Sequence, residues 1–479
     1  MDTFGDMIDR KVVLMATDTE IVRGICQPWV PFYQRLWDDG TIGALCDQRL
    51  LLDTRPRIRN RDTTSGELLF SQPRLPFVSY PHEWSASMFK AAAGVCLSLH
   101  EALFEKGLCL IDSHPWNVLF NAHTPLWVDM TSMEPYEPAT ARQSLFEFRK
   151  TFLNAIDLLY NGNEEIVRSI LAHRFSSIPD SSHHAIVPGG AWRQHRWGTR
   201  LPRAFVQTQL HSIRTVRMDW HRFRQFRAAD FSTARQAMRV IERLRKELDR
   251  FPTTVTQQRS SRNSPTRHVG LSKLELESQT LGAHPLKRSN VPAIDNWLDR
   301  LKSQVRTVLD LGCNMGVFAQ MAAMKGYIVA GVDSNSSAID NLYLTSRKEG
   351  IPISCGIADF VSPRDGQGMV TNPLPRFFER FRADLVVCTG ESYQLYFGTY
   401  LMNFRTMARL FSMYTSRFLI VEFVPNTDPI LKRQFAHEKS DVSYTVANFA
   451  SELSRCFRII EVQPSLPEGR ILYFMEKLP

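Results

Sequence analysis

The chain has 479 residues, with 43% hydrophobic and 22% charged residues, which is typical of a globular protein and excludes a fibrous or wholly disordered chain. This length allows two or three domains with substantial cores. No apolar run reaches the roughly 18 residues that a membrane-spanning helix needs. The amino terminus lacks the basic and apolar regions of a signal peptide, so we expect a cytoplasmic protein.

The net charge of +9 is concentrated in the middle of the chain. Residues 191–270 contain 18 Lys plus Arg against 5 Asp plus Glu, interleaved with aromatic side chains. Such a segment raises the hypothesis of nucleic-acid binding. Arginine stems that pack beside buried aromatic rings explain it better, so nucleic acid is a disfavoured partner. The eight cysteines form no C-x-x-C pair and no zinc-spaced cluster, so we expect reduced thiols and no metal.

Few periodic elements stand out before residue 80, where strands are expected at Val12 to Met15 and Arg49 to Leu52. From Ser85 to Lys106, apolar residues recur at three- and four-residue spacing and predict an amphipathic helix. Ser85 is the expected N-cap of this helix and Gly107 its expected end.

Three polar residues follow this helix at a spacing found in kinase-like phosphotransferases. Asp112 and Asn117 are five residues apart, and Asp129 ends a second apolar run. In such enzymes these positions hold the catalytic base and two metal ligands. The chain lacks the histidine before Asp112, the Gly-rich loop and a V-A-I-K-like strand. A plain strand–turn–strand hairpin therefore competes with a degenerate phosphotransferase lobe, and active phosphoryl transfer is not expected.

Further helices are expected at Phe146 to Leu159, Glu164 to His173 and Ser232 to Arg250. The stretch TTVTQQRSSRNSPTRHVG that follows is almost devoid of apolar residues and marks a domain boundary. We therefore expect a mostly helical α+β accessory domain over residues 1–250 with a basic helical end, for which a degenerate kinase-like fold is one alternative. A linker over 251–289 and an α/β domain over 290–479 complete the expected organisation.

Residues 290–479 alternate between strand and helix patterns, beginning with a helix at Pro292 to Lys302. The strands are expected at Thr307 to Leu311, Tyr327 to Val332, Ile353 to Ile357, Leu385 to Thr389, Phe418 to Phe423, Arg458 to Val462 and Arg470 to Met475. The connection between the last two strands is too short for a crossover helix, so this pair should be antiparallel.

The stretch from Thr307 to Asp333, TVLDLGCNMGVFAQMAAMKGYIVAGVD, carries the clearest chemistry. It is typical of strand, glycine turn, helix and second strand, a unit that presents backbone N–H groups at the carboxyl edge of a parallel sheet. Asp333, at the end of the second strand, would accept hydrogen bonds from ribose hydroxyls. A dinucleotide site requires G-x-G-x-x-G, but Asn314 and Val317 hold two of those glycine positions, which disfavours an NAD-dependent oxidoreductase.

Several sequence blocks together resemble a known family: YPHEWSASMFKAAAGVCLSLHEALFEKGLCLIDSHPWNVLF, VLDLGCNMGVFA, AIDNLYLTSR and FLIVEFVPNTDP. They are similar to the NoeA-type host-specific nodulation proteins of rhizobia and to the related bacterial class I S-adenosylmethionine-dependent methyltransferases. The resemblance runs from about Phe77 to the C-terminus. It implies an α/β class I methyltransferase domain, Rossmann-like, whose seven-stranded sheet has an antiparallel last strand. It also implies S-adenosylmethionine as cofactor, methyl transfer and a role in host-specific nodulation.

The resemblance assigns the site residues by position. The cofactor would be bound by Asp310, Gly312, Asn314, Gly316, Asp333, Asp359 and Phe360. Carboxylates would accept from the ribose hydroxyls and the adenine amine, with the Phe360 ring flanking the base. The alternative role of Asp333 and Asp359 is to cap the helices that follow them.

The loop after the fourth strand lacks the histidine-containing segment that such relatives often have. Glu391 and Tyr393 are therefore the candidate catalytic residues there, against the alternatives of a surface acid and a packing residue. The expected function is methyl transfer from S-adenosylmethionine to a small-molecule or oligosaccharide acceptor, with the N-terminal domain shaping or covering the acceptor pocket. The alternative is a non-catalytic regulatory protein that binds S-adenosylmethionine or S-adenosylhomocysteine.

Overall fold

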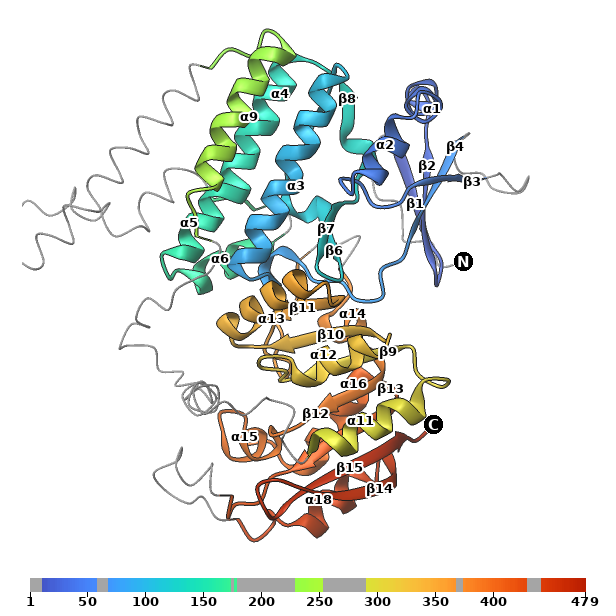
Figure 1. Cartoon of the computed structure of the whole chain (residues 1–479), viewed down its shortest axis with the longest axis vertical. Helices are drawn as coiled ribbons and strands as arrows, with labels where there is room; N and C mark the ends of the chain where they lie inside the picture. Colours follow the sequence, from blue (N-terminus) through green and yellow to red (C-terminus); the bar gives the residue numbers. More distant parts are fainter. Residues whose placement is uncertain are drawn as a thin grey trace, which may run out of the picture.

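The computed structural model describes residues 11–57, 68–173, 176–178, 229–252, 290–367, 374–428 and 441–479. They form an N-terminal region (11–252) and a C-terminal region (290–479), which lie one above the other in Figure 1. Nearly all of the predicted linker over 251–289, and most of the basic segment over 191–270, lies outside the described residues.

The N-terminal region opens with an antiparallel sheet in the order β1-β2-β4-β3. Its elements are β1 (Val12–Ala16), β2 (Glu20–Ile25), α1 (Val30–Asp38), α2 (Thr41–Asp47), β3 (Arg55–Arg57) and β4 (Leu68–Pro73). The strand predicted from Val12 is confirmed. The strand predicted at Arg49 to Leu52 is wrong, because Arg49 takes a φ of 56° after α2 and only an isolated bridge from Leu51 to Trp127 follows.

A long helix, α3, organises the rest of the N-terminal region. The elements are η1 (Pro81–Glu83), α3 (Ala86–Glu105), β5 (Leu108–Leu110), η2 (Pro115–Asn117), β6 (Val118–Asn121), β7 (Thr124–Trp127), η3 (Met130–Ser132), β8 (Met133–Pro135), α4 (Pro138–Phe148), η4 (Arg149–Leu153), α5 (Asn154–Tyr160), α6 (Glu164–Leu171) and α9 (Ala234–Leu248). Ser85 Oγ accepts the N–H of Met88 and Gly107 has a φ of 69°, so both predicted ends of α3 are confirmed. The helix predicted from Phe146 begins earlier, at Pro138, whose ring suits the first helical turn. No helix among the described residues is long and apolar enough to cross a membrane.

The C-terminal region is built on a seven-stranded sheet in the order β11-β10-β9-β12-β13-β15-β14. Its elements are α11 (Asn290–Leu301), β9 (Thr307–Leu311), α12 (Val317–Met324), β10 (Ile328–Asp333), α13 (Ser336–Glu349), β11 (Ile353–Ile357), α14 (Phe377–Arg380), β12 (Ala383–Cys388), α15 (Ser392–Phe397), α16 (Phe404–Tyr414), β13 (Thr415–Phe423), α18 (Val446–Leu453), β14 (Phe457–Ser465) and β15 (Arg470–Lys477). The strands from β11 to β13 pair in parallel. β15 runs antiparallel to both β13 and β14, which confirms the predicted antiparallel last pair.

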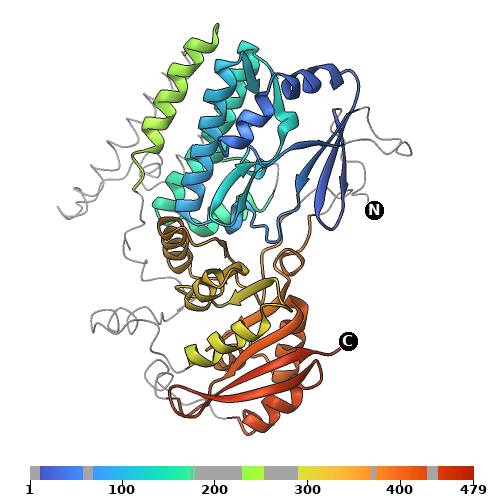
Figure 2. The same ribbon diagram turned by 45° about the vertical axis from the view of Figure 1, so that its right-hand side comes forward.

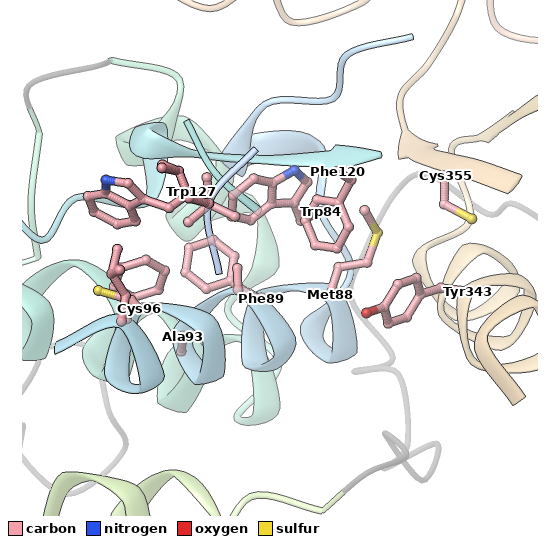
Figure 3. Packing of buried hydrophobic residues seen from close by; sticks show 14 of the residues in the cluster. Trp84, Met88, Phe89, Ala93, Cys96, Phe120, Trp127, Tyr343 and Cys355 are labelled. Carbon is pink, nitrogen blue, oxygen red and sulfur yellow. The ribbon is translucent and has the colours of Figure 1, made fainter. Parts of the chain in front are cut away.

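One hydrophobic core continues from the N-terminal into the C-terminal region. Trp84 packs edge-on against Phe120 of β6, and Phe120 meets Tyr343 of α13 with ring centroids 5.9 Å apart (Figure 3). At the same boundary, the backbone N–H and Oγ of Ser87 donate to the two carboxylate oxygens of Asp340, at 3.0 and 2.9 Å. Figures 1 and 2 show α13 on the side of the C-terminal region that faces the N-terminal region. The regions are therefore joined by packing as well as by the chain.

Candidate functional site

The order of the parallel strands reverses between β9 and β12. The chain proceeds outward from β9 through β10 to β11 and then returns to β12 on the other side of β9. Connections that leave in opposite directions open a crevice at the carboxyl ends of the two strands, where open α/β sheets bind ligands. Two loops meet at this point, Gly312 to Gly316 after β9 and Gly390 to Ser392 after β12.

The turn after β9 has a backbone that favours glycine. Gly312, Asn314 and Gly316 have φ values of 67°, 48° and 70°. The N–H of Gly312 donates to the carbonyl of Val332 at 2.9 Å, which ties the turn to β10. A Cβ atom on Gly316 would lie 2.5 Å from Cδ1 of Leu342, so this glycine also allows α12 and α13 to approach each other.

Asp310 lies beneath this turn, with only 2% of its surface exposed. Its Oδ2 accepts the N–H of Ala319 in the first turn of α12, at 3.0 Å. Burial, with a contribution from Asp333, raises the pKa of Asp310 to about 7. The carboxyl is thus engaged with the helix that follows the turn, and a direct contact with a cofactor stays a prediction.

Two predicted acids lie at the ends of the neighbouring strands. Asp333 accepts the N–H of Asn314 with one oxygen at 2.9 Å and that of Asn335 with the other at 2.7 Å, so it joins β10 to the glycine turn. The side chain of Asn335 caps α13, so helix capping is not the role of Asp333. Asp359 follows β11 and accepts the N–H of Val361 at 3.0 Å.

Two predicted aromatic residues lie in the core. Phe360 is 7% exposed, and its carbonyl accepts the hydroxyl of Tyr414 at 2.7 Å. Tyr393 is 3% exposed and packs against Phe397 and, edge-on, against Tyr444. This placement agrees with the packing alternative for Tyr393. An adenine contact for Phe360 and a catalytic role for Tyr393 stay predictions.

Glu391 lies directly over the glycine turn. A Cβ atom on Gly312 would be 2.9 Å from Cγ and 3.0 Å from Oε1 of Glu391. Burial, together with the nearby carboxylates of Asp333 and Asp359, raises the pKa of Glu391 to about 8. Glu391 is therefore no surface acid, and three carboxyl groups converge on the crevice between β9 and β12.

A buried ionic network holds the loop that carries Glu391, and sequence reasoning missed it. Glu422 is 1% exposed and accepts from Ser465 Oγ at 2.6 Å, from Arg470 Nη1 at 3.2 Å and from the backbone of Gly390. Arg470 Nε also donates to Asp428 at 2.7 Å. The available signal was a lone acid inside the apolar run FLIVEF, since a buried charge needs partners.

Comparison with known proteins gives one relative along most of the chain. The chain is similar to nodulation protein NoeA of Rhizobium meliloti (strain 1021), at 24% identity over 436 residues, which cover 89% of this chain and 85% of the relative. A stretch of 100 residues is 33% identical to the ribosomal protein L11 methyltransferase of Dechloromonas aromatica (strain RCB), covering 19% of this chain and 32% of that protein. No family model matches. The predicted similarity to NoeA-type proteins is confirmed.

Solved structures match part of the chain. N-methyltransferase NodS from Bradyrhizobium japonicum WM9 is 18% identical, with 39% of this chain and 94% of NodS covered and a TM-score of 0.28. A TM-score of this size carries no argument, so the assignment rests on the strand order. Five parallel strands are extended by an antiparallel β15 between β13 and β14, an order typical of class I methyltransferases. The C-terminal region has the class I methyltransferase fold.

The three positions with kinase-like spacing in the N-terminal region are Asp112, Asn117 and Asp129. Asp129 Oδ1 accepts the N–H of Thr131 at 3.0 Å and lies 3.7 Å from Nη1 of Arg23 on β2. Asp112 lies beside Glu147, and burial together with Asp112 raises the pKa of Glu147 to about 7. Asn117 is buried at the end of η2. β6 and β7 form the predicted hairpin between these positions.

Proposed function

We propose that this chain is an S-adenosylmethionine-dependent methyltransferase. The proposal is carried by Glu391 and Asp333, which both contact the glycine turn, and by Asp359, which raises the pKa of Glu391. Both charged neighbours that raise the pKa of Glu391 are acids, so the crevice favours a cationic ligand over a diphosphate. A sulfonium cofactor meets this requirement; the turn would approach its backbone-facing parts, Asp333 would accept from its ribose hydroxyls and Asp359 from its adenine amine.

The cofactor supplies an electrophilic methyl group when it is bound. The residues of this chain then have to orient the acceptor and receive its proton. Glu391 suits the second task once a bound cation has favoured its ionised form, because a carboxylate whose pKa in the free chain is about 8 is a stronger base than an exposed one. Glu391 would receive the O–H or N–H proton of the acceptor as that atom takes the methyl group, while the glycine turn, Asp333 and Asp359 would hold the cofactor that supplies it.

Calorimetry with S-adenosylmethionine tests the cofactor assignment. Wild type should bind, and Asp333→Ala should bind at least about tenfold more weakly because a buried ribose hydroxyl loses its acceptor. Asp295→Ala is the matched control, since Asp295 is a half-exposed acid on α11 that pairs with Lys325. Folded wild type that binds NAD and ignores S-adenosylmethionine would overturn the proposal in favour of an oxidoreductase.

The acceptor that we propose is a small molecule or an oligosaccharide that acts in host-specific nodulation. The support is similarity to NoeA, a nodulation protein, along 89% of the chain. Incubating a cell extract with the protein and methyl-labelled cofactor, then fractionating the labelled product, would identify the acceptor. The matched reaction with Glu391→Gln should give little product. Cofactor binding without labelled product in any extract would support the non-catalytic regulatory alternative.

We further propose that the N-terminal region is a degenerate kinase-like lobe without phosphoryl transfer. Arg23 reaches from β2 to the carbonyl of Val128 at 3.0 Å and to Asp129, so it joins the small sheet to the β6–β7 hairpin. Asp129 therefore has a structural role, in the contact with Arg23. Thermal denaturation with and without magnesium and ATP tests this proposal. A nucleotide-dependent rise in Tm that Asp129→Asn abolishes would overturn it.

A further inference from the structure

We propose that the N-terminal region completes the cofactor site by holding the loop that follows β11. This inference rests on the proposed function. The loop comprises residues 358–367, here called the adenine loop, and it carries Asp359 and Phe360. The N-terminal region holds it through η1 and η2, whose residues thereby act as positioning residues for cofactor binding.

The near end of the adenine loop is bound within the C-terminal region. The N–H of Ala358 donates to the carbonyl of Asp333 at 3.0 Å, and the hydroxyl of Tyr414 donates to the carbonyl of Phe360 at 2.7 Å. These contacts hold the loop on both sides of Asp359. Other partners hold the residues that follow Phe360.

The far end of the adenine loop is bound by the N-terminal region. Nε2 of the buried His82 donates to the carbonyl of Arg364 at 2.9 Å. The N–H of Gln367 donates to the carbonyl of Ala172 at 2.7 Å, which forms part of a short parallel bridge. Only residues 361–363 separate Phe360 from the contact at Arg364, so a shift there reaches Asp359 through very little chain.

Packing at Gly366 reinforces this attachment. A Cβ atom there would lie 2.9 Å from Cη2 of Trp116 and 3.3 Å from Cε1 of His82. Trp116 is buried in η2, where it packs against Tyr80 with ring centroids 4.8 Å apart. η2 lies within the kinase-like spacing from Asp112 to Asn117. That segment therefore packs against the adenine loop, a role that is unrelated to phosphoryl transfer.

A buried ion pair anchors α14, which follows the adenine loop. Nη1 and Nη2 of Arg380 donate to the carboxylate oxygens of Glu83 at 2.8 and 2.5 Å, and both side chains are nearly inaccessible. The guanidinium lies 3.9 Å above the ring of Tyr80. The N–H of Phe377 donates to the carboxylate of Asp365 at 2.9 Å, which links α14 back to the loop.

Through these contacts, the N-terminal region touches the part of the site that is proposed to bind adenine. Besides the contacts already described, η1 and α3 approach the C-terminal region at β11 and α13. Glu391, the proposed base, lies on the other side of the strand reversal, in the loop after β12. Cofactor affinity should therefore respond to changes at this interface.

The test is the full-length variant Gly366→Ala, assayed by calorimetry with S-adenosylhomocysteine and S-adenosylmethionine. The added Cβ meets the rigid Trp116 ring and should displace the adenine loop, weakening both ligands by about tenfold, as expected for losing a hydrogen bond to the adenine amine. Gly94→Ala is the matched control, because a Cβ atom there meets nothing within 4 Å. The double variant Gly366→Ala/Trp116→Phe removes Cη2 and should recover affinity.

A double-mutant cycle with Asp359→Ala distinguishes positioning from a general loss of structure. If the adenine loop acts through Asp359, Gly366→Ala should have little further effect once that carboxylate is gone. Full additivity, or unchanged affinity in Gly366→Ala, would overturn the inference while leaving the proposed function intact. Absence of binding in folded wild type would overturn the proposed function and this inference together.

Discussion

Replacing Glu391 with glutamine tests how the crevice recognises the charge of its cofactor. In the wild type, burial and the two neighbouring acids raise the pKa of Glu391 from 4.5 to about 8, so the side chain holds a proton at neutral pH. A cation bound beside the carboxyl favours its ionised form. Binding of S-adenosylmethionine below pH 8 should therefore release up to one proton from Glu391. S-adenosylhomocysteine lacks the sulfonium and should release less.

The magnitude follows from linkage. Release of one proton on binding makes affinity rise by about tenfold for each pH unit. Between about pH 6.5 and about pH 7.5, the Kd of S-adenosylhomocysteine divided by that of S-adenosylmethionine should therefore rise by up to about tenfold in wild type. Glu391→Gln preserves the shape of the side chain and cannot ionise, so its ratio should be independent of pH.

Calorimetry at several pH values, repeated in two buffers of different ionisation enthalpy, measures both the ratio and the protons released. The two ligands share their amino and carboxyl groups, so titration of the ligand cancels in the ratio. Asp310→Asn is the necessary control, because burial raises the pKa of Asp310 to about 7 in the same crevice. A flat ratio in wild type, or an unchanged slope in Glu391→Gln, would refute the reasoning.

Three further predictions concern stability. Glu83→Gln leaves the buried Arg380 without its counter-charge and should lower the free energy of unfolding, measured in urea, by about 3 kcal/mol. The double variant Glu83→Gln/Arg380→Met should recover part of this loss. An unchanged free energy of unfolding in Glu83→Gln would contradict the prediction. Gly316→Ala places a Cβ atom at a φ of 70° and 2.5 Å from Leu342, and it should lower the free energy of unfolding by at least about 2 kcal/mol. In the double variant with Leu342→Ala, the loss should be smaller than the sum of the two single losses. Between pH 4.5 and about 8 the folded chain keeps the Glu391 proton that the unfolded chain has lost, so stability should fall as pH rises through this window. Thermal denaturation should show a shallower fall in Glu391→Gln, and identical slopes would argue against a Glu391 that is protonated in the folded chain.

The local pattern of apolar runs and turns in the sequence was sufficient to predict the strands of the C-terminal sheet. β9 and β11 have the predicted bounds, because parallel strands covered on both faces are short apolar runs that end at glycine or acidic turns. The antiparallel pairing of β14 and β15 followed from a connection too short for a crossover. These features depend on residues close together in the chain.

The local sequence pattern did not predict most strands of the small N-terminal sheet. β2 reads EIVRGI, which mixes charged and apolar residues, and it pairs with β4 more than forty residues later in the chain. The run at Arg49 to Leu52 looked like a strand but makes only one bridge, to Trp127. Pairing of short antiparallel strands depends on distant partners, so apolar content alone misplaced this strand.

The sequence by itself determined that Gly312, Asp333 and Asp359 stand at the carboxyl ends of neighbouring strands, because strand pattern and turn chemistry are local. The tertiary structure decided what surrounds them. It brought Glu391 over Gly312 from a loop almost eighty residues away. It also placed Trp116 of η2 against the adenine loop, since contacts between distant segments follow from side-chain direction and packing rather than from spacing along the chain.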